Sequence, residues 1–311
     1  MAKPTFRANP IQVQVPGSSA NLGPGFDCFG LALGLHDRFI AQITDEAGLD
    51  LDVTGEGSET VRRDEKNLMV KAMYQGFDFM GGKPRGLSVR ALNVIPHGRG
   101  LGSSASAIVG GLVLARALVL SGNERMIDDE LLNIATKMEG HPDNVAAALY
   151  GGATIAWTED QHGHPVARAV GITVDPRITA LAFVPNNSVP TSKARKLLPE
   201  AISHGDAVAN STRTALLSQA LSHRPDLLFT ATEDFLHQKY RQEVMPKSFS
   251  LVTKLRSAGV AAFISGAGPT VLVLHAGLST TDVAELGKAA GEHFQLQPLE
   301  IAASGATVIS A

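Results

Sequence analysis

The chain has 311 residues, of which 44% are hydrophobic and 18% are charged. This length and apolar content can bury a sizeable core, and they favour two domains over one. The formal net charge is −3 and the basic residues are dispersed, so the composition excludes the electrostatic surfaces that bind nucleic acid or an anionic membrane.

The cysteine content and the apolar stretches indicate the compartment. The one cysteine, Cys28, excludes an internal disulfide and is typical of a reducing environment. We expect it to be a small apolar residue of the interior rather than a nucleophile. The first residues lack the apolar core of a secretory signal, and the most apolar stretch, residues 107–120, is too short to span a bilayer. We therefore expect a cytoplasmic protein.

The first half of the chain alternates strand and helix signals around two glycine-rich segments. Apolar and polar residues alternate over residues 11–15, which predicts a half-buried strand that ends at the segment PGSSANLGPGFD, residues 16–27. A predicted strand at residues 87–91 leads into a second glycine-rich segment, residues 96–106. The elements predicted after it are helices at residues 103–120, 129–138 and 143–149 and a strand at residues 153–158.

A polar, turn-rich passage between residues 158 and 175 is expected to end the first domain, so we expect domains at residues 1–165 and 166–311. The elements predicted in the second half are a strand at residues 178–184, helices at 194–199, 208–221, 225–240 and 247–258, a strand, glycine turn and strand over 262–274, a helix at 281–294 and a strand within 299–309. Because this order lacks the regular alternation of a doubly wound sheet, the sequence predicts an α+β fold.

The segment PHGRGLGSSAS, residues 96–106, carries the main functional signal. Its glycines at 98, 100 and 102 can adopt positive φ angles, and free amides at the start of the following helix attract phosphate. A P-loop is excluded because Gly102 is not followed by Lys, and a dinucleotide fingerprint would follow the first strand of the chain. From this segment alone, a phosphate-binding loop and a tight turn with a serine helix cap both remain open.

Three segments together resemble the motifs of the galactokinase, homoserine kinase, mevalonate kinase and phosphomevalonate kinase (GHMP) superfamily. They are residues 16–27, 96–105 and 265–270 (SGAGPT), in the order of that superfamily and spread over almost the whole chain. The segments most similar to homoserine kinases are NLGPGFD at 21–27, HPDN at 141–144, VPTSKAR at 189–195 and HQKYR at 237–241. The resemblance implies a two-domain GHMP kinase fold. Its N-terminal domain would resemble domain 2 of ribosomal protein S5, its C-terminal domain would be ferredoxin-like, and the active site would lie between them.

The reaction that this resemblance implies is transfer of the γ-phosphoryl group of ATP to the side-chain hydroxyl of L-homoserine. The product would be O-phospho-L-homoserine, an intermediate of threonine biosynthesis. The resemblance implies ATP and Mg²⁺ as cofactors and no nucleic-acid or membrane partner. Because such kinases are commonly dimers, it also implies a homodimer.

The resemblance also assigns a nucleotide site. Ser104 and Glu139 match the residues that bind Mg²⁺, a hard cation that accepts a hydroxyl and a carboxylate. Asn67 matches a position close to adenine, although an asparagine there could equally cap a helix. The residues expected to contact the nucleotide are Asn67, Pro96, His97, Gly98, Arg99, Gly100, Leu101, Gly102, Ser103, Ser104, Ala105 and Ser106.

Homoserine is a zwitterion with one hydroxyl, so its pocket needs a cation, an acceptor for the ammonium group and a group near the reactive oxygen. Arg195 and Arg241 resemble the arginines that bind the carboxylate in the family, and a planar guanidinium suits bidentate binding. The expected substrate-binding residues are Asn21, Asp27, His141, Thr191, Arg195, Arg241 and Gly266. One departure precedes Arg241, where the chain has Gln-Lys in place of the usual Glu-Pro.

No residue is expected to act as a general base. Homoserine kinases have an asparagine where some superfamily members have a catalytic aspartate, which corresponds here to Asn144 beside Asp143. We expect catalysis by alignment and charge stabilisation, with Asn21, Asp143, Asn144 and Arg195 as the catalytic group. Three alternatives stay open: a mevalonate-type or sugar kinase of the same superfamily, a sensor that binds nucleotide and ligand without chemistry, and a nicotinamide-dependent oxidoreductase.

Overall fold

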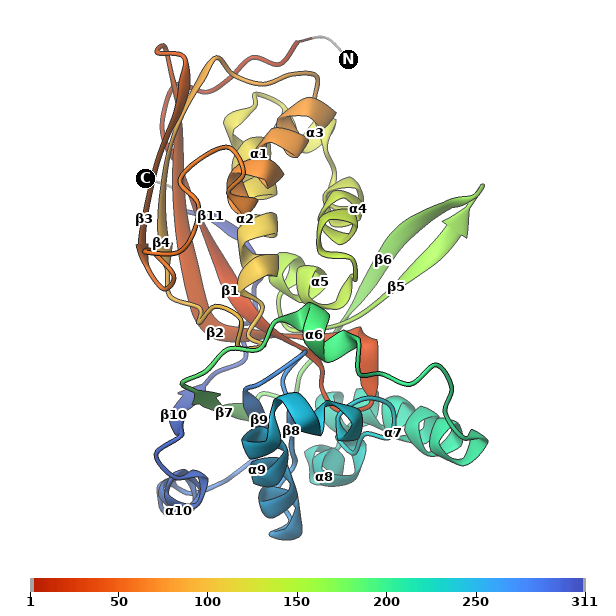
Figure 1. The fold of residues 1–311 in the computed structure, drawn as a ribbon. Coiled ribbons are helices and arrows are strands. Elements are labelled where there is room, and N and C mark those ends of the chain that lie inside the picture. The colour runs from red at the N-terminus through yellow and green to blue at the C-terminus, as the bar shows by residue number, and fades with distance from the viewer. Residues whose placement is uncertain (1–2, 310–311) are drawn as a thin grey trace.

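The computed structural model describes residues 3–309, which form two halves, one above the other in Figure 1. The upper half is built on a seven-stranded sheet with the order β11-β1-β2-β4-β3, to which β5 and β6 are added through β2. Its strands are β1 (Ile11–Asn21), β2 (Gly25–Thr44), β3 (Gly48–Gly55), β4 (Gly86–Asn93), β5 (Ala153–Gln161), β6 (His164–Ile172) and β11 (Thr307–Ile309). The pair β3–β4 is parallel, and the other neighbouring pairs are antiparallel.

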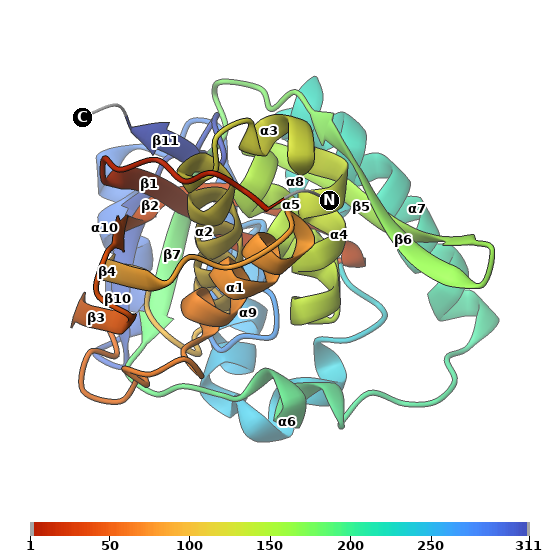
Figure 2. The same cartoon turned by 90° about the horizontal axis from the view of Figure 1, so that it is seen from above.

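Helices cover one face of this sheet, and the β5–β6 hairpin projects away from the body (Figures 1 and 2). The helices are α1 (Leu68–Phe79), α2 (Ser103–Leu118), α3 (Gly122–Arg125), α4 (Asp128–Glu139) and α5 (Asp143–Tyr150). Helix α2 is apolar on nearly all sides because it is buried in the middle of the core. Gly111 lets α1 pack closely against it, since a Cβ there would lie 2.4 Å from the carbonyl oxygen of Met69. No helix within residues 3–309 combines the length and apolar character of a membrane span.

The lower half is built on a four-stranded antiparallel sheet with the order β10-β7-β9-β8. Its strands are β7 (Thr179–Pro185), β8 (Ala262–Ile264), β9 (Val271–His275) and β10 (Phe294–Leu299). Its helices are α6 (Thr191–Arg195), α7 (His204–Ser222), η1 (Pro225–Leu227), α8 (Leu228–Ala231), η2 (Lys239–Val244), α9 (Pro246–Ser257) and α10 (Thr280–Ala290). Helical segments follow β7, the β8–β9 pair comes next, and α10 precedes β10. This order of elements and strands is ferredoxin-like, so the predicted α+β fold is confirmed.

The chain crosses between the halves more than once. Strand β6 runs through residue 165, the expected domain boundary, and pairs with β5 along its whole length. After β10 the chain returns to the first sheet, where Ile301 bridges Leu33 and β11 pairs with β1. Residues on both sides of the expected boundary therefore contribute to the upper sheet.

Some predicted elements are wrong. The helix expected at residues 225–240 ends at Ala231, because the carboxylate of Asp234 binds backbone amides that a continuing helix would need. The amides that donate to it are those of Leu236, His237 and Gln238. The strand expected within residues 299–309 is split into the end of β10 and β11, and the helix expected at 194–199 ends at Arg195.

Candidate active site

The glycine-rich loop between β4 and α2 is held from both halves of the molecule by its carbonyl groups. Four consecutive carbonyl oxygens accept hydrogen bonds: Gly98 from Val189 N (3.0 Å), Arg99 from Thr270 N (3.2 Å), Gly100 from Ser265 Oγ (2.6 Å) and Leu101 from Ser18 N (3.0 Å). Within residues 3–309, the amides of residues 98–102 donate to no protein acceptor. The loop therefore has its acceptors satisfied and its donors free, which is the arrangement that binds an anion.

Glycine is required in this loop because of both its conformation and its close contacts. Gly98, Gly100 and Gly102 have φ angles of 65°, 75° and 74°. A Cβ on Gly100 would lie 2.2 Å from the carbonyl oxygen of Ser265, and one on Gly102 would lie 2.0 Å from the Oγ of Ser18. Side chains at these positions would push the loop away from the segments that hold its carbonyls.

Ser104 and Glu139 meet beside this loop, at the first turn of α2 and the last residue of α4. The hydroxyl of Ser104 contacts both carboxylate oxygens of Glu139, with a distance of 2.5 Å to Oε1. A hydroxyl and a carboxylate are hard oxygen donors, so the pair fits the Mg²⁺ that the sequence predicts. Asp27, His141 and Asp143 also place ligand atoms within 4.8 Å of one another, but these carboxylates already have protein partners.

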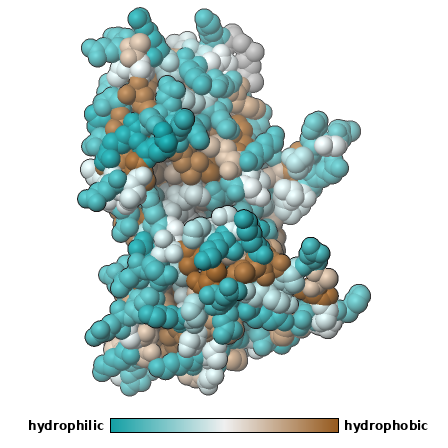
Figure 3. Space-filling view, viewed as in Figure 1, coloured by the Kyte–Doolittle hydropathy of each residue, from teal (hydrophilic) through white to brown (hydrophobic). Residues whose placement is uncertain are grey.

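A cavity of about 130 Å³ opens beside the loop, between the two halves. It is lined by Ala20, Asn21, Asp27, Gly98, Gly100, Gly102, Ser103, Ser104, Glu139, His141, Asp143, Asn144, Thr191, Arg195, Arg241, Gly266 and Ala267. The structure therefore brings together all the predicted substrate-binding and metal-binding residues. Most of the surface in Figure 3 is hydrophilic, and hydrophobic side chains gather on both sides of the narrow waist between the halves.

The turn from β1 into β2 supplies one wall of this cavity. Asn21, Leu22 and Asp27 have φ angles of 70°, 48° and 56°, in the left-handed region that costs free energy for residues other than glycine. The amide group of Asn21 supports the turn: its Nδ2 donates to the carbonyl oxygen of Gly266 at 2.9 Å, and its Oδ1 accepts from the amide of Asp27 at 3.0 Å. The turn therefore holds the Asp27 carboxylate in a fixed place.

Asp27 and Arg195 form a bidentate ion pair across the cavity. Arg195 Nη1 donates to Asp27 Oδ2 at 2.9 Å, and Nη2 donates to Oδ1 at 2.6 Å. About a third of each side chain is exposed, so the pair is accessible from the cavity. The hydrogen bonds to Asp27 raise the pKa of Arg195 above its ordinary value, so its guanidinium stays charged.

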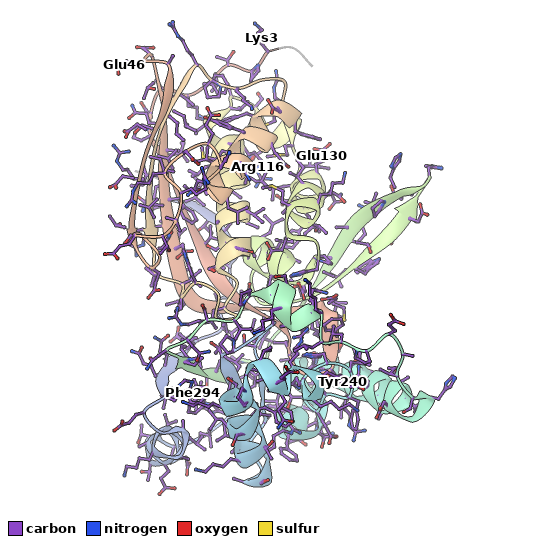
Figure 4. All side chains as sticks on the ribbon, in the orientation of Figure 1. Lys3, Glu46, Arg116, Glu130, Tyr240 and Phe294 are labelled. Carbon is purple, nitrogen blue, oxygen red and sulfur yellow. The ribbon has the colours of Figure 1, made fainter. Side chains whose placement is uncertain are left out.

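Arg241 is buried, and in the part of the chain that the structure describes no acidic group is in hydrogen-bond contact with its guanidinium. It is 1% exposed, its Nη1 donates to the carbonyl oxygen of Gly266 at 3.0 Å, and its Nε has no hydrogen-bond partner among residues 3–309. Burial, with the nearby charge of Arg195, lowers its pKa to about 10. At neutral pH this group is therefore a desolvated cation beside the cavity, which a ligand carboxylate would neutralise. Figure 4 labels the neighbouring Tyr240 in the lower half.

His141, Asp143 and Asn144 line the opposite wall, where α4 is followed by α5. His141 Nδ1 and Asp143 Oδ1 lie 2.5 Å apart, and Asp143 also accepts from the amide of Asn144. Burial alone would lower the pKa of His141, but the hydrogen bond and charge of Asp143 outweigh it and raise the pKa. The Oδ1 of Asn144 accepts from the hydroxyl of Ser18 at 2.8 Å. The side chains of Asp143 and Asn144 therefore each have a hydrogen-bond partner within the protein.

A second cavity, of about 370 Å³, adjoins the start of α2. Its wall is largely apolar, from side chains such as Phe39, Val53 and Met69, and Ser103 and Ser104 line both cavities. Asn67 lies in this wall as the N-cap of α1: its Oδ1 accepts from the amide of Met69, and its Nδ2 donates to the carbonyl oxygen of Arg62. A flat apolar group attached to an anion in the loop would fit here.

Some predicted nucleotide contacts line neither cavity. These residues are Pro96, Arg99, Leu101, Ala105 and Ser106. The guanidinium of Arg99 donates to the carbonyl oxygens of His97, Pro185 and Asn186, and so joins the loop to the lower half. Leu101 and Ala105 are buried, and Ser106 donates to the buried Asp37. The side chains of these residues line neither cavity, so the prediction that they contact the nucleotide now applies only to their backbone atoms.

Sequence reasoning missed several residues that build the site. Phe26 lies next to Asp27 and contacts both arginines. Ser18 and Ser265 hold the loop carbonyls, and their signal was present, because both lie in glycine-rich segments that the sequence singled out. Asp37 binds the amides of Val94 and Ile95 just before the loop, and no local pattern marks it.

Two family profiles match the chain. GHMP kinases N terminal domain matches residues 67–152, and GHMP kinases C terminal matches residues 214–296. The chain is 50% identical over 309 residues to homoserine kinase of Streptomyces avermitilis, with 99% of each chain covered. It is 45% identical to homoserine kinase of Mycobacterium tuberculosis over 89% of this chain and 88% of that protein. A crystal structure of homoserine kinase from Cytophaga hutchinsonii superposes with a TM-score of 0.82 at 25% identity, covering 99% of this chain and all of that one.

Proposed function

Since the chain belongs to the GHMP kinase family, and within it to the homoserine kinases, we propose that it transfers the γ-phosphoryl group of ATP to the side-chain hydroxyl of L-homoserine. The product is O-phospho-L-homoserine, which threonine biosynthesis consumes. The observation that carries this proposal is the position of the loop at residues 98–102. Its free amides lie at the edge of a cavity that also contains Asp27, Arg195 and Arg241, the charges that an amino acid needs.

The two cavities divide the nucleotide between them. The phosphates would bind the free amides of the loop and the N-terminus of α2, and the base would occupy the apolar second cavity near Asn67. Ser104 and Glu139 would hold Mg²⁺. The ion would neutralise charge on the phosphate oxygens, and the two residues are kept in contact by the ends of α2 and α4.

The first cavity binds the amino acid. Arg195 and Arg241 take the carboxylate and Asp27 takes the ammonium group, while Asn21, His141, Thr191 and Gly266 line the remaining walls. Homoserine therefore replaces the internal ion pair between Asp27 and Arg195 with two pairs of its own. Its side-chain hydroxyl is directed toward the loop, where the terminal phosphate lies.

Catalysis rests on alignment and on stabilisation of charge, without a general base. Asn144 is an amide, and the Asp143 carboxylate is occupied by His141 and by the Asn144 amide. The hydroxyl oxygen attacks the γ-phosphorus, the bond to the β-phosphate oxygen breaks, and the hydroxyl proton passes to a phosphate oxygen directly or through water. Asn21 and Arg195 contribute by fixing the amino acid.

A coupled ADP-release assay with Mg²⁺ and ATP tests this function. Homoserine, mevalonate, galactose and serine form the panel, and homoserine should have the highest kcat/KM by a wide margin. Arg195→Ala should raise the KM for homoserine far more than the KM for ATP, while Arg224→Ala, in an exposed ion pair with Asp226, should change neither. Higher activity with mevalonate or galactose would favour another kinase of the family, and nucleotide binding without turnover would favour a sensor.

The remaining expectations are part of the same proposal. We propose a homodimer, to be tested by light scattering coupled to size-exclusion chromatography. A cytoplasmic location agrees with the lone cysteine of the sequence. Division into domains at residues 1–165 and 166–311 is proposed as well. Because β6 pairs with β5 on both sides of residue 165, the test is whether the two fragments, expressed separately, each fold as measured by circular dichroism.

A further inference from the structure

One aromatic side chain contacts both arginines of the cavity. The ring centroid of Phe26, the second residue of β2, lies 5.5 Å from the Cζ of Arg195 and 5.6 Å from the Cζ of Arg241. Both distances lie within the range in which a guanidinium is attracted to the face of an aromatic ring. Arg195 comes from α6 and Arg241 from η2, so this ring joins two segments that are otherwise separate in the chain.

The ring of Phe26 also packs against the imidazole ring of His237. The two ring centroids are 5.2 Å apart, with an angle of 32° between the planes. His237 is fully buried, and its Nε2 contacts the carbonyl oxygen of Gly23 at 2.8 Å, three residues before Phe26. Burial lowers the pKa of His237, so its imidazole is neutral and donates this hydrogen bond. His237 therefore fixes both the turn and the ring without adding a third cation.

The backbone on either side of Phe26 is also fixed. The carbonyl oxygen of Pro24 accepts from Asn210 Nδ2 and from Thr214 Oγ1, both on α7. On the other side, the amide of Asp27 donates to Asn21. The ring therefore has a defined position, against which the flexible side chains of the arginines can be set.

Two neighbouring guanidinium groups repel each other, and among the described residues 3–309 an acidic partner is in hydrogen-bond contact with Arg195 but not with Arg241. When Asp27 turns to a substrate ammonium group, that partner is lost as well. An aromatic face is a site that attracts both cations and leaves their N–H groups free for a ligand. Carboxylate binding then needs less reorganisation of the arginines.

We propose that Phe26, supported by His237, is a positioning residue that sets Arg195 and Arg241 for the carboxylate of the substrate. This inference rests on the proposed function and goes beyond it, because it assigns the selectivity for a carboxylate to a residue that would make no polar contact with it. Loss of the ring should weaken binding only of ligands that carry a carboxylate.

The test compares two acceptors in steady-state kinetics. One is L-homoserine, and the other is the amino diol in which a hydroxymethyl group replaces its carboxylate. Phe26→Leu should raise the KM for homoserine about tenfold, the effect of losing two cation–ring contacts, and leave the KM for ATP unchanged. With the amino diol, the same variant should have the KM of the wild type. Phe26→Tyr, which keeps the ring, should restore most of the affinity for homoserine.

Two further variants keep the test decisive. Phe26→Met supplies apolar volume without a ring and replaces Phe26→Leu if that variant does not fold. Phe229→Leu is the matched control, because it removes a ring that lies 4.6 Å from the Cζ of Arg256, outside the cavity. Equal increases in KM for homoserine and the amino diol, or no increase for either, would overturn the proposal. Failure of the proposed function would appear separately, as a wild-type enzyme without preference for homoserine.

Discussion

The ion pair between Asp27 and Arg195 leads to a prediction about substrate selection. In the free protein each group satisfies the other, through two hydrogen bonds of 2.9 and 2.6 Å. A zwitterion replaces both partners at once, whereas a ligand with only a carboxylate takes Arg195 and leaves Asp27 without its partner. We therefore predict that Asp27→Asn reduces the preference for homoserine over 4-hydroxybutyrate, which has the same hydroxyl and carboxylate and no ammonium group.

The magnitude follows from the exposure of the pair. With about a third of each side chain exposed, solvent screening limits the pair to about 1 kcal/mol. Removing it should strengthen binding of 4-hydroxybutyrate by about that amount, or roughly fivefold. Homoserine gains the same amount but loses a charged hydrogen bond worth about 1.5–3 kcal/mol, so its binding should weaken by up to about 30-fold. The ratio of the two affinities should change by about 1.5–3 kcal/mol, or roughly 10- to 150-fold.

Isothermal titration of both ligands against wild type and Asp27→Asn measures these affinities directly. Asp226→Asn is the matched control, because Arg224 and Asp226 form an exposed bidentate pair with distances of 2.9 and 2.7 Å away from the cavity. This control should bind both ligands as the wild type does. The reasoning is refuted if Asp27→Asn binds 4-hydroxybutyrate no better than the wild type, because Arg195 would then not be restrained by Asp27.

Four other perturbations test separate parts of the site. Gly100→Ala, at a φ of 75° with a Cβ 2.2 Å from a carbonyl oxygen, should destabilise the fold by about 1–3 kcal/mol in denaturant titrations and abolish ATP binding; an unchanged ATP affinity would argue against the loop. Glu139→Gln should raise the Mg²⁺ concentration needed for nucleotide binding about tenfold, without changing homoserine binding, in calorimetric titrations. Partial burial raises the pKa of the half-buried Cys28 to about 11, so the native thiol should resist iodoacetamide at pH 8, and rapid alkylation there would contradict the raised pKa. Asp143→Asn should lower the pKa of His141 in an NMR titration; because Asp143 favours the protonated imidazole, its contribution to stability is fully present below about pH 6.5 and is lost as the pH rises through the folded-state pKa.

Local patterns predicted much of the fold. The strand at the start of β1 and the helices α2, α4 and α5 were found because their periodicity or capping lies within a few residues of sequence. Strand β2 was missed because residues 29–33 are buried on both faces and show no apolar–polar alternation. In its later part burial does alternate, but the buried Asp37 and the exposed Ile40 reverse the expected polarity. The short β11 was predicted only as part of one longer strand within residues 299–309, because its pairing partner β1 lies at the opposite end of the chain.

The site shows the same division. The glycine-rich segments identified the loop, and residues such as Asn21, His141 and Arg241 do line one cavity. What the sequence did not predict is how these groups engage one another: the pairing of Asp27 with Arg195 joins residues 168 positions apart. The contacts of Phe26 with Arg195, Arg241 and His237, on which its proposed positioning role rests, likewise join segments that only the fold brings together.

The return of the chain to its first sheet has a consequence for synthesis on the ribosome. Translation delivers β1 early and β11 at the end, so the upper sheet receives its last strand only after the lower half has been made. Pairing over such a separation is slow, because a large loop must close before the contact forms. Nascent chains stalled before β11 should therefore retain an open β1 edge, where a chaperone or another nascent chain could bind.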